Sequence, residues 1–180
     1  MDQIIEWDKE LFLYLNGLNT GNWDTFWLLV TRIENWIPLY VIFFILFWKT
    51  LSRKRALLAT LFTFILTGCT LAITTIVKNT VTRLRPSNTP ELDGLVRVLQ
   101  NNTDFSFFSG HSAVSFAITV FIVLVLKSHT KWIWLLFIWP LLFAISRVFV
   151  GVHYPGDLVI GAIVGTLLGM TAWKLLRNRF

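Results

Sequence analysis

One uncharged stretch, residues 56–77, most constrains what this chain can fold into. Its 22 residues contain no Asp, Glu, Lys or Arg, and about 20 such residues are enough for a helix to cross the hydrocarbon core of a bilayer. Of the chain's 180 residues, 55% are hydrophobic and only 14% are charged, whereas about a quarter are charged in a soluble domain. These values exclude a soluble domain and a disordered or fibrous chain. We therefore predict an integral membrane protein.

Four shorter uncharged stretches predict further spans, at residues 36–48, 112–126, 132–145 and 158–173. Stretches of this length can still cross a membrane when their polar ends reach the interface or the interior of a bundle. The predicted fold class is an all-α integral membrane helical bundle of about five transmembrane helices. We expect one domain over residues 1–180, with its transmembrane core at 36–180.

Residues 1–35 predict amphipathic helices that lie at the membrane interface, since Ile4, Leu11 and Leu15 share one helical face while charged residues interrupt any span. The first ten residues are acidic, so no signal peptide is expected. In the loop at 79–107, four apolar residues at helical spacing predict a short helix, either on the membrane surface or packed against the protein: Leu92, Leu95, Val96 and Leu99.

The distribution of basic residues predicts the orientation. In a five-span topology, nine of them fall on one side: Lys49, Arg53, Lys54, Arg55, Lys127, Lys131, Lys174, Arg177 and Arg179. The positive-inside rule makes that side cytoplasmic, together with the C-terminus. The N-terminus, the loop at 79–107 and the turn at 147–157 are then expected on the periplasmic or extracellular face of the cell (inner) membrane.

Three polar stretches lie at span ends on that outer face. In the first, Lys78 and Arg85 are seven residues apart, so a continuing helix would point both cations to one side, and Pro86 marks a break. Two converging cations suit a phosphate. The alternative is that both side chains reach for lipid headgroups.

The second stretch is Ser109-Gly110-His111, directly before an apolar span. Ser109 is a plausible N-cap, which would leave backbone N–H groups free to bind an anion at a helix N-terminus. Gly110 allows close approach to the backbone, and His111 would have a proton to donate. The alternative is simple capping beside an interfacial histidine.

The third stretch contains Arg147, His153 and Asp157. A carboxylate four residues after a histidine can fix the imidazole tautomer, which leaves the other ring nitrogen as an electron-pair donor. A structural His–Asp pair is the alternative for this stretch alone. Together, however, the three stretches predict one anionic pocket equipped for phosphoryl transfer through a phosphohistidine.

The three stretches resemble the signatures of the type 2 phosphatidic acid phosphatase superfamily. Lys78, six residues and Arg85-Pro86 match the first signature, and Ser109-Gly110-His111 matches most of the second. The third is matched in full by Ser146-Arg147, five residues, His153, three residues and Asp157. One position departs from the pattern, because Phe108 stands where the family usually has proline. We expect this to affect the geometry of the loop and not the chemistry.

The resemblance implies a role for each residue. His153 would be the nucleophile that attacks phosphorus, with Asp157 orienting it, and His111 would protonate the leaving oxygen and then activate water. The implied ligands of the phosphoryl oxygens are Lys78, Arg85, Arg147, Ser109 and the Gly110 backbone N–H. With three cations present no metal or cofactor is expected. The residues' own chemistry agrees with these roles.

The expected partner is a lipid phosphate held in the bilayer, with no nucleic acid and no obligate protein partner. Among lipid phosphate and pyrophosphate phosphatases, the resemblance is greatest to enzymes acting on undecaprenyl pyrophosphate. The alternative substrates are phosphatidylglycerophosphate, phosphatidic acid and lipid A. Remote alternatives are a vanadate-dependent haloperoxidase and a non-catalytic receptor for phosphorylated lipids.

Overall fold

The structure is a computed structural model, which describes residues 2–18 and 21–179, and the regular elements of this part of the chain are all helical. The α-helices are α1 (Asp2–Gly17), α2 (Asp24–Thr31), α3 (Ile37–Thr50), α4 (Arg53–Val81), α5 (Gly110–Leu126), α6 (Ile138–Phe149) and α7 (Pro155–Leu176). Short 3₁₀ helices are η1 (Ile33–Trp36), η2 (Pro86–Asn88), η3 (Pro90–Leu92), η4 (Lys131–Phe137) and η5 (Arg177–Arg179).

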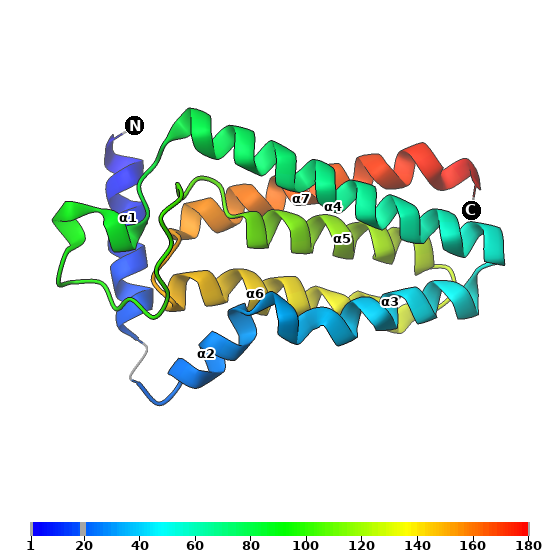
Figure 1. Cartoon of the computed structure of the whole chain (residues 1–180), viewed down its shortest axis with the longest axis horizontal. Coiled ribbons are helices and arrows are strands. Elements are labelled where there is room, and N and C mark those ends of the chain that lie inside the picture. The colour runs from blue at the N-terminus through cyan, green and yellow to red at the C-terminus, as the bar shows by residue number, and fades with distance from the viewer. Residues whose placement is uncertain (1, 19–20, 180) are drawn as a thin grey trace.

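Helices α3 to α7 run side by side along the long axis of the molecule, and α1 crosses one end of this bundle (Figure 1). The predicted all-α membrane bundle is confirmed. Four helical segments are long and apolar enough to cross a membrane: Ile33–Thr50, Arg53–Leu92, Lys131–Phe149 and Pro155–Arg179. The remaining predicted span, at residues 112–126, coincides with α5, which has 17 residues and is mostly buried by its neighbours. Because neighbouring helices bury most of α5, polar residues at its ends can face the bundle interior and not lipid.

Three glycines on one face of α7 bring this helix into close contact with α5. Gly161, Gly165 and Gly169 recur every four residues, so they lie on the same helical face. A Cβ atom added at Gly165 would lie 2.1 Å from the backbone oxygen of Ala113 on α5. This packing brings the beginnings of α5 and α7 together, where the Ser109 N–H donates to the Asp157 carbonyl oxygen at 3.0 Å.

The two ends of the bundle differ in character. Figure 1 shows the α3–α4 turn and the C-terminus at the end opposite α1 and the loop that follows α4. The basic residues of the sequence prediction therefore lie far from the three polar stretches, as a five-span topology requires. The assignment of each end to a side of the membrane stays a prediction.

Helix α1 packs on the protein through one side and exposes apolar residues on another. Phe12 is fully buried, with its ring centroid 5.4 Å from that of Tyr154. Asn16 donates to the carbonyl oxygens of Arg97 and Val148 at 3.1 and 3.0 Å. Ile4 is 67% exposed. A helix that crosses the bundle end with an exposed apolar side suits the predicted interfacial position.

The short helix predicted from Leu92 to Leu99 is wrong. The 3₁₀ helix η3 ends at Leu92, and Gly94 then adopts a φ of +72°, which turns the chain out of a helical path. The N–H of Leu99 donates instead to the carbonyl oxygen of Val150, at 3.1 Å. The apolar spacing therefore reflects separate contacts of a loop.

The α5–α7 contact makes a testable prediction about stability. Replacing Gly165 with Ala should push the helices apart and cost about 1–3 kcal/mol of unfolding free energy, measured by denaturation of the purified protein in detergent. Gly68 on α4 is the matched control, since nothing lies within 4 Å of a Cβ added there. Gly68→Ala should be neutral or stabilising by about 0.5–1 kcal/mol. Equal destabilisation by both substitutions would contradict the proposed contact.

Candidate functional site

His153 lies in the turn between α6 and α7 and is only 1% exposed. Its Nδ1 is 3.4 Å from Asp157 Oδ2, and Arg85 Nη1 lies 3.0 Å from its Nε2. Burial lowers the pKa of His153 well below 6.5, and the positive charges of Arg85, Arg147 and Lys78 lower it further. A neutral ring with its proton on Nδ1 fits both neighbours, since Arg85 can only donate. The predicted contact of His153 with Asp157 is present in the structure.

Asp157 is fully buried in the first turn of α7 and accepts several hydrogen bonds. Its Oδ2 accepts from the Tyr154 N–H at 3.0 Å and from Ser106 Oγ, while its Oδ1 accepts from Arg83 Nη1 at 2.8 Å. A buried carboxylate needs such partners to stay ionised. Neither Ser106 nor Arg83 is among the site residues predicted from the sequence. Arg83 is two residues before Arg85, but nothing in the local sequence separates it from a surface cation.

Lys78 and Arg85 converge on one carboxylate, that of Asp104. Lys78 Nζ lies 2.7 Å from Asp104 Oδ2, and Arg85 Nη2 lies 2.8 Å from Asp104 Oδ1. The expectation that one helix aims both cations is wrong, because α4 ends at Val81 and Thr82 adopts a φ of +51°. Arg85 instead reaches the site from an extended segment.

Asp104 itself was not among the predicted site residues, because its loop carries no recognisable motif. Partial burial alone would raise the pKa of its carboxyl group. The hydrogen bond from Lys78 and the charge of Arg85 outweigh this effect and hold the pKa below its ordinary value. Asp104 is therefore ionised at neutral pH and balances part of the positive charge.

Arg147 extends from the last turn of α6 and is 1% exposed. Its Nη1 donates to Gln100 Oε1 at 2.9 Å and to Thr31 Oγ1. Its buried Nε has no acceptor in the described part of the chain. A buried guanidinium N–H without an acceptor is costly, and an oxyanion in the site would supply one.

Ser109 caps α5, as predicted, and its Oγ accepts the Ser112 N–H at 3.4 Å. The N–H groups of Gly110 and His111 have no acceptor among residues 2–18 and 21–179. A Cβ atom at Gly110 would lie 3.3 Å from Thr74 on α4. Phe108, at the position where proline was expected, is buried and follows a cis peptide bond.

His111 is the second residue of α5 and has its ring centroid 4.7 Å from that of Phe143 on α6. The positive charges of Arg147, Arg85 and Lys78 disfavour a positive charge on the His111 ring. A charge on His153 has the same effect. The structure thus brings all eight predicted residues to one end of the bundle. Three cations and two free N–H groups at a helix N-terminus are suited to a tetrahedral oxyanion.

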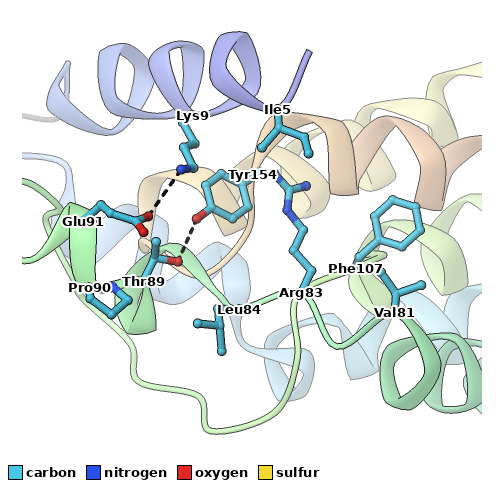
Figure 2. Close-up of a pocket in the computed structure, with 10 residues that line it drawn as sticks. All are labelled: Ile5, Lys9, Val81, Arg83, Leu84, Thr89, Pro90, Glu91, Phe107 and Tyr154. Atoms are coloured by element: carbon cyan, nitrogen blue, oxygen red, sulfur yellow. Dashed lines mark hydrogen bonds and ion pairs between the residues drawn. The ribbon is translucent and has the colours of Figure 1, made fainter. Parts of the chain in front are cut away.

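A pocket of about 610 Å³ adjoins this cluster between α1, the end of α4 and the loop after it. Figure 2 shows Arg83 and Tyr154 in its wall, with the Lys9–Glu91 ion pair at one side. Most of its other lining is apolar and includes Ile5, Leu84 and Phe107. The pocket therefore offers an apolar environment beside the polar cluster. Among the residues with described positions, no group of three His, Cys, Asp or Glu side chains could hold a metal ion.

The pairing of Asp104 with two cations makes a testable prediction. Asp104→Asn should increase the affinity for inorganic phosphate by about three- to tenfold, because Lys78 and Arg85 no longer face a competing negative charge. Calorimetric titration of the purified protein with phosphate would measure this. Asp93→Asn, an exposed acid of the same loop, is the matched control and should leave the affinity unchanged. Weaker phosphate binding by Asp104→Asn would contradict the prediction.

Comparison with known proteins places these features in a family. Residues 56–180 match the family model described as the PAP2 superfamily. The chain is 32% identical over 175 residues to a lipid A 4'-phosphatase of Bacteroides thetaiotaomicron, which covers 92% of this chain and 74% of that protein. An undecaprenyl-diphosphatase of Sulfolobus acidocaldarius is 34% identical over 74 residues, covering 41% of this chain and 34% of the other.

The fold has a solved counterpart. A transmembrane PAP2 type phosphatidylglycerolphosphate phosphatase from Bacillus subtilis superposes with a TM-score of 0.79 at 21% identity, covering 99% of this chain and 88% of that one. At this identity the similarity supports the fold alone. The family match extends over more than half of the chain and contains all three predicted motifs. The chain therefore belongs to the PAP2 superfamily and is a membrane lipid phosphatase that hydrolyses phosphate esters.

Proposed function

We propose that this enzyme removes a phosphate group from lipid A, the acylated and phosphorylated sugar lipid. The full-length similarity to a lipid A 4'-phosphatase supports this substrate. The sequence alone favoured undecaprenyl pyrophosphate, but the undecaprenyl-diphosphatase match covers less than half of either chain. Lipid A was one of the alternatives, and the comparisons favour it. Undecaprenyl pyrophosphate is the second candidate.

The observation that carries the proposed chemistry is the buried contact of His153 with Asp157 on one side and Arg85 on the other. In the proposed reaction, Arg85 turns its hydrogen bond to a phosphoryl oxygen and leaves the Nε2 lone pair free. Nε2 then attacks phosphorus in line, and the bond from phosphorus to the sugar oxygen breaks. This forms a phosphohistidine and a leaving alcohol.

His111 is proposed as the acid that gives its proton to the leaving oxygen. In the second step the same ring takes a proton from water, which attacks the phosphohistidine and releases inorganic phosphate. Asp157 and Ser106 hold the other side of the His153 ring, so that its proton stays on Nδ1. The products are the dephosphorylated lipid and phosphate.

The negative charge that develops on the phosphoryl oxygens needs fixed donors. We assign this role to Lys78, Arg85 and Arg147, whose Nε lacks an acceptor. The Gly110 N–H and Ser109 at the start of α5 complete the set. These groups can stabilise the charge without a metal ion. We place the site at the periplasmic or extracellular face and the C-terminus in the cytoplasm, because the basic residues lie at the opposite end of the bundle.

A panel of lipids tests the substrate. Purified enzyme is given lipid A, undecaprenyl pyrophosphate, phosphatidylglycerophosphate and phosphatidic acid in matched detergent micelles, and phosphate release is measured. We expect the highest kcat/KM for lipid A, and His153→Ala should abolish release from every lipid while the protein keeps its folding transition. A preference for undecaprenyl pyrophosphate would overturn the proposed substrate. Retained turnover in His153→Ala would overturn the mechanism, and halide oxidation with added vanadate would support the haloperoxidase alternative.

The pH dependence tests the state of His153. Because burial and nearby cations lower its pKa well below 6.5, the ring is neutral and nucleophilic through neutral pH and loses activity only when protonated in acid. The profile of kcat/KM should be bell-shaped, with the midpoint of its acidic limb below about 6.5. Initial rates in a constant-ionic-strength buffer series measure it. A rate that rises continuously from about pH 4 to about pH 10 would contradict the assignment of an acid and a base.

A further inference from the structure

We propose that Arg83 and Asp8 are positioning residues that act together on Asp157, and through it on His153. Arg83 holds the carboxylate in place, and Asp8 on α1 balances the charge of Arg83. This inference rests on the proposed roles of His153 and Asp157. Arg83 is one of the six unspecified residues between Lys78 and Arg85 in the first motif, and Asp8 lies outside the residues that the family model matches.

The geometry of Arg83 joins two carboxylates. Its Nη1 lies 2.8 Å from Asp157 Oδ1, and its Nη2 lies 2.8 Å from Asp8 Oδ2. The centre of the guanidinium group is 3.9 Å from the centroid of the Tyr154 ring. Figure 2 shows the Arg83 side chain extending from the segment after α4 toward α1, beside Tyr154. The two ion pairs and the ring fix the guanidinium in one orientation.

Asp8 makes a second contact at the start of α7. Its Oδ1 accepts the Gly156 N–H at 2.7 Å, in the first turn of the helix that carries Asp157. A Cβ atom at Gly156 would lie 2.8 Å from Asp8 Oδ2, so glycine allows this close approach. The Asp8 side chain is 14% exposed. One carboxylate of α1 therefore holds both Arg83 and the backbone that precedes Asp157.

The surrounding charges determine what each residue does. Lys78, Arg85 and Arg147 act on His153 from α4, the following segment and α6, and Asp104 opposes them from the loop. His111 on α5 also interacts electrostatically with His153. Asp157 adds a negative charge from α7 at the Nδ1 side. Arg83 offsets that charge, and Asp8 in turn offsets Arg83. The balance decides how tightly the His153 ring holds a second proton.

Two substitutions should therefore change the enzyme in opposite directions. In Arg83→Gln the charge of Asp157 is no longer offset, which raises the pKa of His153 and moves the acidic limb of kcat/KM to higher pH. In Asp8→Asn the charge of Arg83 is no longer offset, which lowers that pKa and moves the limb to lower pH. Each shift should be on the order of half a pH unit to one unit.

A comparison of kcat with KM distinguishes a positioning role of Arg83 from a role in substrate binding. Arg83→Gln should lower kcat by about 10- to 100-fold with KM nearly unchanged, because the imidazole loses its fixed orientation while the phosphate ligands remain. Asp8→Asn should cause a smaller loss of kcat. Arg83→Lys keeps the charge but cannot hold both carboxylates in the same fork, so kcat should fall without a shift of the acidic limb. In the double variant Asp8→Asn/Arg83→Gln the losses should be less than multiplicative.

The control is Glu10→Gln, which makes the same acid-to-amide change at an exposed position of α1. It should match the wild type in kcat, KM and pH profile. Opposite limb shifts with a preserved folding transition support the proposal. The proposal is overturned if Arg83→Gln and Asp8→Asn shift the acidic limb in the same direction or leave it unmoved. Wild-type folding of Arg83→Lys would show that such a result does not come from misfolding at this position. Turnover retained by His153→Ala would instead overturn the proposed function.

Discussion

The site depends on a carboxylate buried at the start of α7. Asp157 is 0% exposed, and an ionised carboxylate without partners at such a position would cost several kcal/mol. Its four partners come from three separate parts of the chain: His153 and the Tyr154 backbone in one turn, Ser106 in the outer loop, and Arg83 after α4. Because each partner satisfies the same group, the turn before α7, the outer loop and the segment after α4 are held together at one end of the bundle.

The glycine face of α7 makes this arrangement possible. Its contact with α5 leaves no room for a Cβ atom at Gly165, so the two helices begin side by side. The start of α5, with its free N–H groups, then lies next to the turn that carries His153. Helix packing inside the membrane is thus directly linked to the positions of the polar residues at its surface.

Much of this could be predicted from the sequence, because the relevant signals are local. The uncharged stretch at 56–77 and its shorter counterparts correspond to helices, the spacing of His153 and Asp157 is one helical turn, and Ser109 has the side chain of an N-cap. The remaining features depend on contacts distant in sequence. Asp104 and Ser106 lie in a loop without a motif.

The residue at which α4 ends could not be predicted from the sequence. Thr82 takes a positive φ and ends α4 four residues before Pro86, the break that local rules predicted. Gly94 likewise has a positive φ and interrupts the helix that the spacing of the apolar loop residues predicted. The turn at Thr82 leads to the contact of Arg85 with Asp104, which is distant in sequence. At Gly94 the cause is local, because glycine readily adopts a positive φ.

The residues proposed to carry out the reaction and those that could select the lipid lie in different parts of the structure. The motif residues are proposed to bind only the phosphate group, which every candidate lipid carries, so they would not distinguish one phosphorylated lipid from another. Residues outside the motifs must make that distinction, and those nearest the site belong to α1 and the loop after α4. The apolar pocket beside Arg83 is built from these same segments, at the end of the bundle where exposed apolar residues of α1 suit a membrane interface. Because Asp8 joins α1 to the support of Asp157, a change in α1 that alters lipid contacts also reaches the proposed nucleophile. Substrate preference and catalytic rate are therefore expected to change together in this enzyme.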